Sequence, residues 1–122
     1  MKFDDNIPIY LQIMDECKRR IITDEYQPAM KVPPVRELAV AFGVNPNTVQ
    51  RALSELEREG LFISERTSGR YICNDMDKIA ALKNDAVQER ITHFLDEMKQ
   101  YGCSEEDVTV LIRERINNGK IN

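Results

Sequence analysis

The stretch VPPVRELAVAFGVNPNTVQRALSELEREG, residues 32–60, decides the fold. Within it, the apolar spacing of Val35–Phe42 predicts a short helix, and residues 43–45 predict a turn. Pro46–Glu59 predicts a second helix, because Asn45 is a favourable N-cap and proline fits the first helical position. Two short helices joined by such a turn are typical of a helix-turn-helix.

The second of these helices has one apolar face and one polar face. Its apolar residues recur at intervals of three and four, which predicts a buried stripe made of Val49, Ala52, Leu53 and Leu56. At roughly 100° per residue, the opposite face carries Asn47, Arg51, Ser54 and Arg58, with Gln50 and Thr48 on its flanks.

The chemistry of this polar face favours nucleic acid as a ligand. Arginine pairs with guanine, and asparagine or glutamine pairs with adenine, through two hydrogen bonds at the edge of the base. The first turn of the helix also offers free backbone N–H groups that bind phosphate. An ordinary solvated face is the alternative interpretation, and the helix-turn-helix context favours DNA over it.

The flanking segments complete one small domain. Pro8–Thr23 predicts a helix with apolar residues every fourth position, and Met30–Val32 can pair briefly as an edge strand. Leu61–Glu65 and Arg70–Cys73 predict two strands joined by a four-residue hairpin loop. The predicted fold is therefore mainly α with a small β-hairpin, a winged helix-turn-helix domain over residues 1–75.

Residues 76–122 predict a two-helix tail. Val87, Ile91, Phe94 and Met98 follow a heptad-like spacing of four, three and four, and a second stripe includes Leu111 and Ile112. A helical hairpin of this length cannot enclose a large core alone, so the tail is predicted to mediate dimerisation. The predicted dimer interface consists of Val87, Ile91, Phe94, Met98, Leu111 and Ile112.

Composition narrows the function classes. The 122 residues are 42% hydrophobic and 31% charged, a balance typical of a soluble globular protein. Three well-separated cysteines and a single histidine, His93, provide no disulfide framework, zinc site or catalytic dyad. The sequence contains no membrane-length apolar run, and its acidic start differs from a signal peptide. We therefore expect a cytoplasmic protein that is not an enzyme, with no catalytic residue, metal or cofactor, and no membrane partner.

The charge balance requires any nucleic-acid contact to be local. The net charge is −4. Residues 1–75 carry ten basic and twelve acidic side chains, and residues 76–122 carry seven and nine. Because each part is net negative, a patch of basic residues rather than a global field must hold a polyanion.

Several motifs resemble the DNA-binding domain of GntR-family transcription regulators. They are Val-Pro-Pro-Val-Arg-Glu-Leu-Ala (32–39), Phe-Gly-Val-Asn-Pro-Asn-Thr-Val (42–49), Leu-Glu-Arg-Glu-Gly-Leu (56–61) and Pro-Ile-Tyr-Leu-Gln-Ile (8–13). The pieces Val-Arg-Glu-Leu-Ala (35–39) and Val-Asn-Pro-Asn-Thr-Val (44–49), together with the short two-helix tail, resemble the YtrA subfamily in particular. The resemblance implies a winged-helix regulator of transcription.

The resemblance also implies DNA contacts by particular residues. Arg36 matches the arginine of the Arg-Glu-Leu motif, Asn45, Asn47 and Thr48 match the start of the recognition helix, and Gly69 matches a wing glycine. The residues themselves add Arg66 and Arg70, which flank the hairpin tip and place positive charge where a wing meets phosphate. The complete predicted DNA-binding set is Arg36, Asn45, Asn47, Thr48, Gln50, Arg51, Arg66, Ser68, Gly69 and Arg70.

Two function hypotheses follow. The first is a transcriptional regulator of the repressor type that binds an inverted-repeat operator on double-stranded DNA as a homodimer. The alternative is a winged-helix module for protein–protein interaction without specific DNA binding, which the net negative charge of residues 1–75 favours. Nothing in the sequence indicates a small-molecule effector, which would have to bind between subunits or at the junction of tail and wing.

Overall fold

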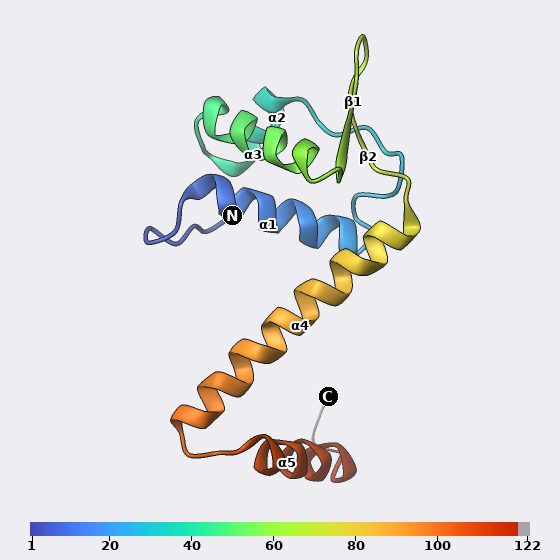
Figure 1. Cartoon of the computed structure of the whole chain (residues 1–122). Helices are drawn as coiled ribbons and strands as arrows, with labels where there is room; N and C mark the ends of the chain where they lie inside the picture. The colour runs from blue at the N-terminus through green and yellow to red at the C-terminus, as the bar shows by residue number, and fades with distance from the viewer. Residues whose placement is uncertain (120–122) are drawn as a thin grey trace. The chain divides into compact units, whose positions relative to one another are not determined.

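The computed structural model describes residues 1–119, which form five helices and a two-stranded sheet (Figure 1). The elements in chain order are α1 (Ile9–Ile22), α2 (Val35–Phe42), α3 (Pro46–Arg58), β1 (Phe62–Glu65), β2 (Gly69–Ile72), α4 (Met76–Gln100) and α5 (Glu105–Asn117). The chain divides into two compact units, Met1–Leu82 and Lys83–Asn122. The predicted fold, mainly α with one hairpin, is confirmed.

α1 begins directly after Pro8 and buries one side of the helix. Ile13, Cys17 and Ile21 are buried at the predicted four-residue spacing, since this spacing keeps side chains on one helical face. The pKa of the Cys17 thiol is raised to about 12, mainly because the thiol is buried. This cysteine is therefore an unreactive core residue. The Gln12 side chain holds the preceding arm: it accepts from the Asp4 amide at 2.8 Å and donates to the Asp4 carbonyl at 2.7 Å.

α2 and α3 form the helix-turn-helix. α2 ends at Gly43, whose φ of +68° lies in the left-handed region that glycine adopts without strain. The Asn45 side chain accepts from the Asn47 amide at 2.7 Å and caps α3, with Pro46 in the first turn. The predicted cap is therefore confirmed, as is the buried stripe of Val49, Ala52, Leu53 and Leu56.

The hairpin gains a third short segment. β1 and β2 are antiparallel, with Ser64 opposite Arg70 and Glu65 opposite Gly69. Lys31 forms an isolated bridge with Tyr71, which confirms that residues 30–32 act as a short edge strand. This segment continues into α2, so the wing and the helix-turn-helix are tied together through the backbone.

A half-buried arginine, Arg20, lies close to two aromatic rings at the edge of the core of the first unit. The Arg20 guanidinium carbon lies 5.4 Å from the Tyr26 ring centroid and 5.2 Å from that of Phe42. Arg20 also donates to Glu16 at 2.8 Å and to the Tyr26 hydroxyl at 3.1 Å. The hydrogen bond from Arg19 is the main cause that lowers the pKa of Glu16 to about 2; burial opposes the shift and Arg20 adds to it. This network joins α1, α2 and the loop after α1.

The first unit continues past the predicted end of the winged domain. α4 begins at Met76, but Ile79 and Leu82 pack against the core of the first unit. The compact unit therefore ends after Leu82 rather than after Asp75.

The second unit contains the rest of α4 and α5. Gly102, with a φ of +81°, lies in the turn between them. Ser104 and Asp107 form a reciprocal capping box at the start of α5, with bonds of 3.0 and 3.1 Å, which confirms the predicted cap. Val108 is the buried residue of α5.

Candidate nucleic-acid interface

The outer face of α3 presents the polar groups expected of a recognition helix. Asn47, Gln50 and Arg51 are exposed, whereas Thr48 is half-buried. Nε2 of Gln50 donates to Oγ of Ser54 at 3.2 Å, one turn further along the helix, so a hydrogen bond links these two side chains. From Asn45 to Ser54 the sequence carries no acidic residue. This part of α3 can therefore approach a polyanion without charge repulsion.

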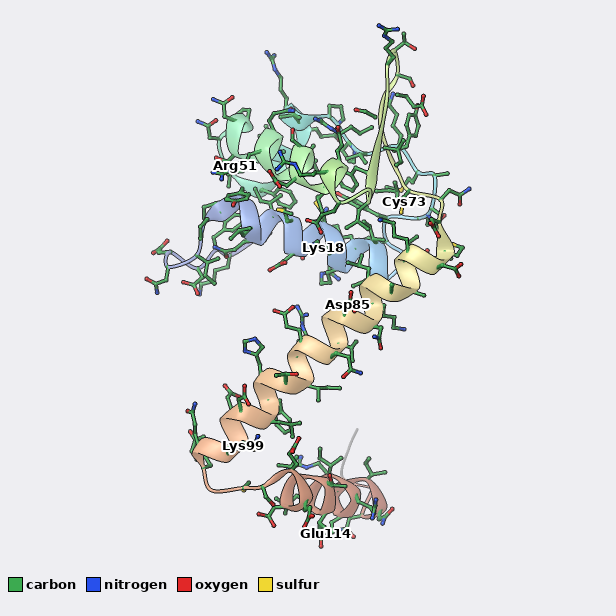
Figure 2. All side chains as sticks on the ribbon, viewed as in Figure 1. Lys18, Arg51, Cys73, Asp85, Lys99 and Glu114 are labelled. Carbon is green, nitrogen blue, oxygen red and sulfur yellow. The ribbon has the colours of Figure 1, made fainter. Side chains whose placement is uncertain are left out.

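Arg51 is not simply projected into solvent. Its guanidinium carbon lies 3.8 Å from the centroid of the Tyr10 ring, a cation–π contact between α3 and the first turn of α1. In Figure 2, Arg51 is labelled on the side of α3 that faces α1. The sequence placed Arg51 opposite the buried stripe but gave no indication of this contact.

Arg36 lies at the helix-turn-helix beside the start of α3. It is exposed at the start of α2. Arg36 shares a shallow depression with Asn45, although the two are nine positions apart in the chain; the depression is lined by Arg36, Ala39, Val40, Gly43, Val44, Asn45 and Pro46. The two residues can therefore contact one ligand together.

The tip of the wing is exposed, and Gly69 next to it packs close to Lys31. Arg66, Thr67 and Ser68 are exposed between the two strands. Gly69 has a φ of +112°, and a β-carbon there would lie 3.4 Å from Cε of Lys31. Glycine is required at this position mainly by the backbone conformation, which side chains rarely adopt. The same contact places the Lys31 side chain against the wing.

Arg70 lies at the base of the wing and is paired. Its Nε donates to Oε1 of Glu57 on α3, and Oγ of Ser64 donates to the same oxygen at 3.1 Å. The Arg70 and Glu57 side chains are only 20% and 29% exposed. The sequence predicted Arg70 as a phosphate ligand; the structure gives it a protein partner that joins the wing to α3.

Nine of the basic side chains in residues 1–75 divide into two sets. Five of the ten basic side chains in residues 1–75 form ion pairs with glutamates: Lys18, Arg19, Arg20, Arg58 and Arg70. Within residues 1–119, no ion pair involves Lys31, Arg36, Arg51 or Arg66. These four belong to the helix-turn-helix, the edge strand and the wing. The net negative charge of this part of the chain therefore coexists with unpaired cations on the elements predicted to contact DNA.

The predicted dimer residues are largely exposed in the single chain. Val87, Ile91 and Phe94 on α4 are 44%, 44% and 40% exposed, and Leu111 and Ile112 on α5 are 55% and 44% exposed. Met98 is half-buried. Exposed aliphatic and aromatic side chains in this number are typical of an interaction surface.

The described part of the chain holds no group of three or more histidine, cysteine or acidic side chains placed to bind a metal ion. Among residues 1–119, no helix combines the length and apolar character needed to span a membrane.

Sequence reasoning overlooked three residues that shape this interface, namely Tyr10, Glu57 and Ser64. Tyr10 lies within the Pro-Ile-Tyr-Leu-Gln-Ile motif, which was interpreted only as the opening of a helix. Glu57 falls about 80° from Val49 on the helical wheel, on a flank of α3 that the following hairpin can reach. This position on the flank was the signal in the sequence that could have indicated a contact between Glu57 and the hairpin.

A helix-turn-helix with a β-hairpin wing, and with unpaired cations around an exposed amide- and arginine-bearing helix, defines a winged-helix protein of the DNA-binding class. Residues 9–72 match the sequence model of the bacterial regulatory proteins of the gntR family. The chain belongs to this family.

Relatives over most of the chain agree with this membership. The uncharacterized HTH-type transcriptional regulator YhcF of Bacillus subtilis is 37% identical over 107 residues, 88% of either chain. The HTH-type transcriptional repressor YtrA of the same organism is 38% identical over 93 residues, 76% of this chain and 67% of YtrA. A GntR family transcriptional regulator from Listeria monocytogenes has a similar structure, with a TM-score of 0.84 and 36% identity over 92% of this chain and 98% of its own.

Proposed function

We propose that this DNA-binding transcriptional regulator is a cytoplasmic repressor that binds an inverted-repeat operator as a homodimer. Membership of the family, and the regulators and repressors among the relatives, support sequence-specific DNA binding. The competing hypothesis, a protein-interaction module without DNA binding, depended on the negative charge of residues 1–75. Within residues 1–119, Lys31, Arg36 and Arg66 form no ion pair, and they lie on the edge strand, α2 and the wing. A local patch of this kind can hold DNA although the net charge is negative, which answers that argument.

The observation that carries the proposal is the outer face of α3. Asn47, Gln50 and Arg51 supply the amide and guanidinium groups that distinguish base pairs in the major groove. Thr48 and Asn45 lie at the helix start, where free backbone N–H groups attract phosphate. We assign base contacts to this face.

The remaining predicted contacts position the protein on the DNA backbone. Arg36 lies beside the start of α3 and can contact the phosphate that flanks the groove. Arg66, Ser68 and Gly69 form the exposed end of the wing, where Gly69 permits close approach. Arg70 contributes through Glu57, by holding the wing against α3.

The names and complexes of relatives support repression in particular. YtrA and NagR of Bacillus subtilis are both HTH-type transcriptional repressors. The DNA-binding domain of AraR has been solved in complex with its operator; it is 27% identical, with a TM-score of 0.53 over 60% of this chain. We extend operator binding to this chain on that basis.

We infer the homodimer from the exposed apolar residues of α4 and α5. One helix-turn-helix reads only a few base pairs, and two related by a two-fold axis read an inverted repeat. A second copy of the chain would cover the exposed residues Val87, Ile91, Phe94, Leu111 and Ile112, and with them Met98.

A selection of genomic DNA fragments by the purified full chain tests the proposal. We expect enrichment of an inverted repeat, and an affinity for it that falls steeply as salt rises, because phosphate contacts release counterions. Transcription from a promoter that contains the repeat should decrease when the protein is added. The protein-interaction module would be favoured if no fragment were enriched and if any residual affinity for DNA did not change with salt.

A further inference from the structure

The contact between Tyr10 and Arg51 joins a core helix to the proposed reading face. Tyr10 lies in the first turn of α1 and is half-buried, and Arg51 lies in the second turn of α3 and is exposed. The 3.8 Å separation between the guanidinium carbon and the ring centroid is that of a close stack. α1 packs along α3, and the half-buried Tyr10 packs against the core of the first unit, so the fold itself restrains the ring.

The stack restricts the guanidinium without using its donors. A guanidinium has two flat faces and five N–H donors, which point outward in its plane. The ring of Tyr10 covers one face and leaves the in-plane donors free. Within residues 1–119, Arg51 makes no ion pair and no side-chain hydrogen bond to protein, so its donors are available to a ligand.

We propose that Tyr10 is a positioning residue for sequence specificity: its ring fixes the plane of Arg51 so that the guanidinium meets a guanine edge through two hydrogen bonds. This inference rests on the proposed function of α3. An arginine free in solvent loses side-chain entropy when it docks in a groove, and a pre-stacked arginine has already lost part of it. Only the correct base pair benefits, because phosphate contacts do not need the guanidinium plane to be fixed.

A double-mutant cycle on the full chain tests the proposal, with the selected operator and a scrambled duplex as probes. Arg51→Met removes the donors but keeps the stem, and we expect about a ten- to hundred-fold loss of operator affinity with little change on the scrambled duplex. Tyr10→Leu removes the aromatic face, and we expect about a two- to ten-fold loss on the operator only. In the Arg51→Met background, Tyr10→Leu should change operator affinity by less than about two-fold.

Two further variants separate positioning from a general effect on folding. Tyr10→Phe keeps the aromatic face and should bind like the original chain. Leu11→Ala shortens an exposed apolar residue in the same turn and should also bind like it. Thermal unfolding of each variant shows whether the fold has been retained.

The outcomes distinguish this inference from the proposed function. If Arg51→Met leaves operator binding unchanged, Arg51 is not a reader, and both the assignment of Arg51 and the role of Tyr10 fail. If Arg51→Met weakens binding but Tyr10→Leu does not, or strengthens it, only the positioning role fails. The role also fails if Tyr10→Phe loses as much as Tyr10→Leu, or if the loss persists in full without Arg51.

Discussion

Arg70 on β2 and Glu57 on α3 form an ion pair that joins the wing to the recognition helix. Ser64 on β1 donates to the same Glu57 oxygen, so both strands are held by one carboxylate. Both partners of the ion pair are largely shielded from water. The angle between wing and helix is therefore set by side chains as well as by the short connection at Gly60 and Leu61.

Loss of this pair should misplace the wing without removing a phosphate contact. We expect Arg70→Met to lower operator affinity about five-fold, equivalent to roughly 1 kcal/mol, because the wing must be ordered on binding. The slope of affinity against salt should stay unchanged. Glu57→Gln should have a similar effect, and the double variant should add little. Anisotropy titrations over a salt series measure both quantities, and a flatter slope for Arg70→Met would show that Arg70 contacts phosphate directly.

Arg36 and Arg66 should behave in the opposite way. Neither forms an ion pair within residues 1–119, so each is free to neutralise a phosphate. Arg36→Ala and Arg66→Ala should each weaken binding to operator and scrambled DNA alike and should reduce the salt slope by about one. Lys18→Ala is the matched control, because Lys18 lies on α1 and its Nζ is 3.0 Å from Oε1 of Glu59. Equal slopes for all three variants would contradict the assignment.

The sequence predicted most of the fold because its elements carry local signals. Pro8, Asn45 and Ser104 mark helix starts, and the apolar spacing of α1 and α3 defines their buried faces. The charge pairing could not be predicted in the same way. Which carboxylate meets Arg70 depends on how the hairpin folds back onto α3, and this is set by tertiary packing. The Tyr10–Arg51 stack was hidden for the same reason, since 41 positions separate the two residues in the chain.

The Glu16 carboxylate should make stability depend on acid pH. Its pKa is lowered to about 2 in the folded chain by hydrogen bonds from Arg19 and Arg20. A lowered folded pKa gives a stabilisation that is complete above the unfolded value of about 4.5 and is lost as pH falls towards 2.

We therefore expect Glu16→Gln to lower the free energy of unfolding by about 1 kcal/mol at pH 7, a value reduced for solvent screening. The difference from the original chain should shrink between pH 4.5 and pH 2. Thermal unfolding followed by circular dichroism measures it. Asp15→Asn, at an exposed neighbouring position, serves as the control, and a difference that stays constant with pH would exclude the ion pairs as the cause.

Charges placed on the tail should separate two copies of the chain. Phe94→Glu with Leu111→Glu would bury unpaired carboxylates in the proposed interface. The free energy of removing these charges from water would prevent dimerisation. Sedimentation at micromolar concentration should then show a monomer with an intact fold and much weaker operator binding. Gln88→Glu with Thr109→Glu, both at exposed polar positions, should leave the dimer in place. A monomeric original chain that still binds its inverted repeat tightly would overturn the role of the tail.

One loop residue offers a stabilising substitution. Ala29 has a φ of +65°, in the left-handed region where a β-carbon is strained. Ala29→Gly should raise the free energy of unfolding by up to about 1 kcal/mol, because relief of strain exceeds the added freedom of the unfolded chain. Ala41→Gly, at an exposed position in α2, should lower it by about the same amount. Denaturant titrations compare the two, and a loss of stability at position 29 would contradict the expectation.

The separation of paired from unpaired cations has a consequence for how the protein finds its target. DNA repels the net negative remainder of the chain, so an encounter through the wrong face is short-lived. An encounter through α3 and the wing is attractive, because Lys31, Arg36 and Arg66 belong to those elements or adjoin them. The first collision is thereby oriented before any base is read. We expect association to be fast at low salt and the residence time on unrelated DNA to be brief, which shortens the search for an operator.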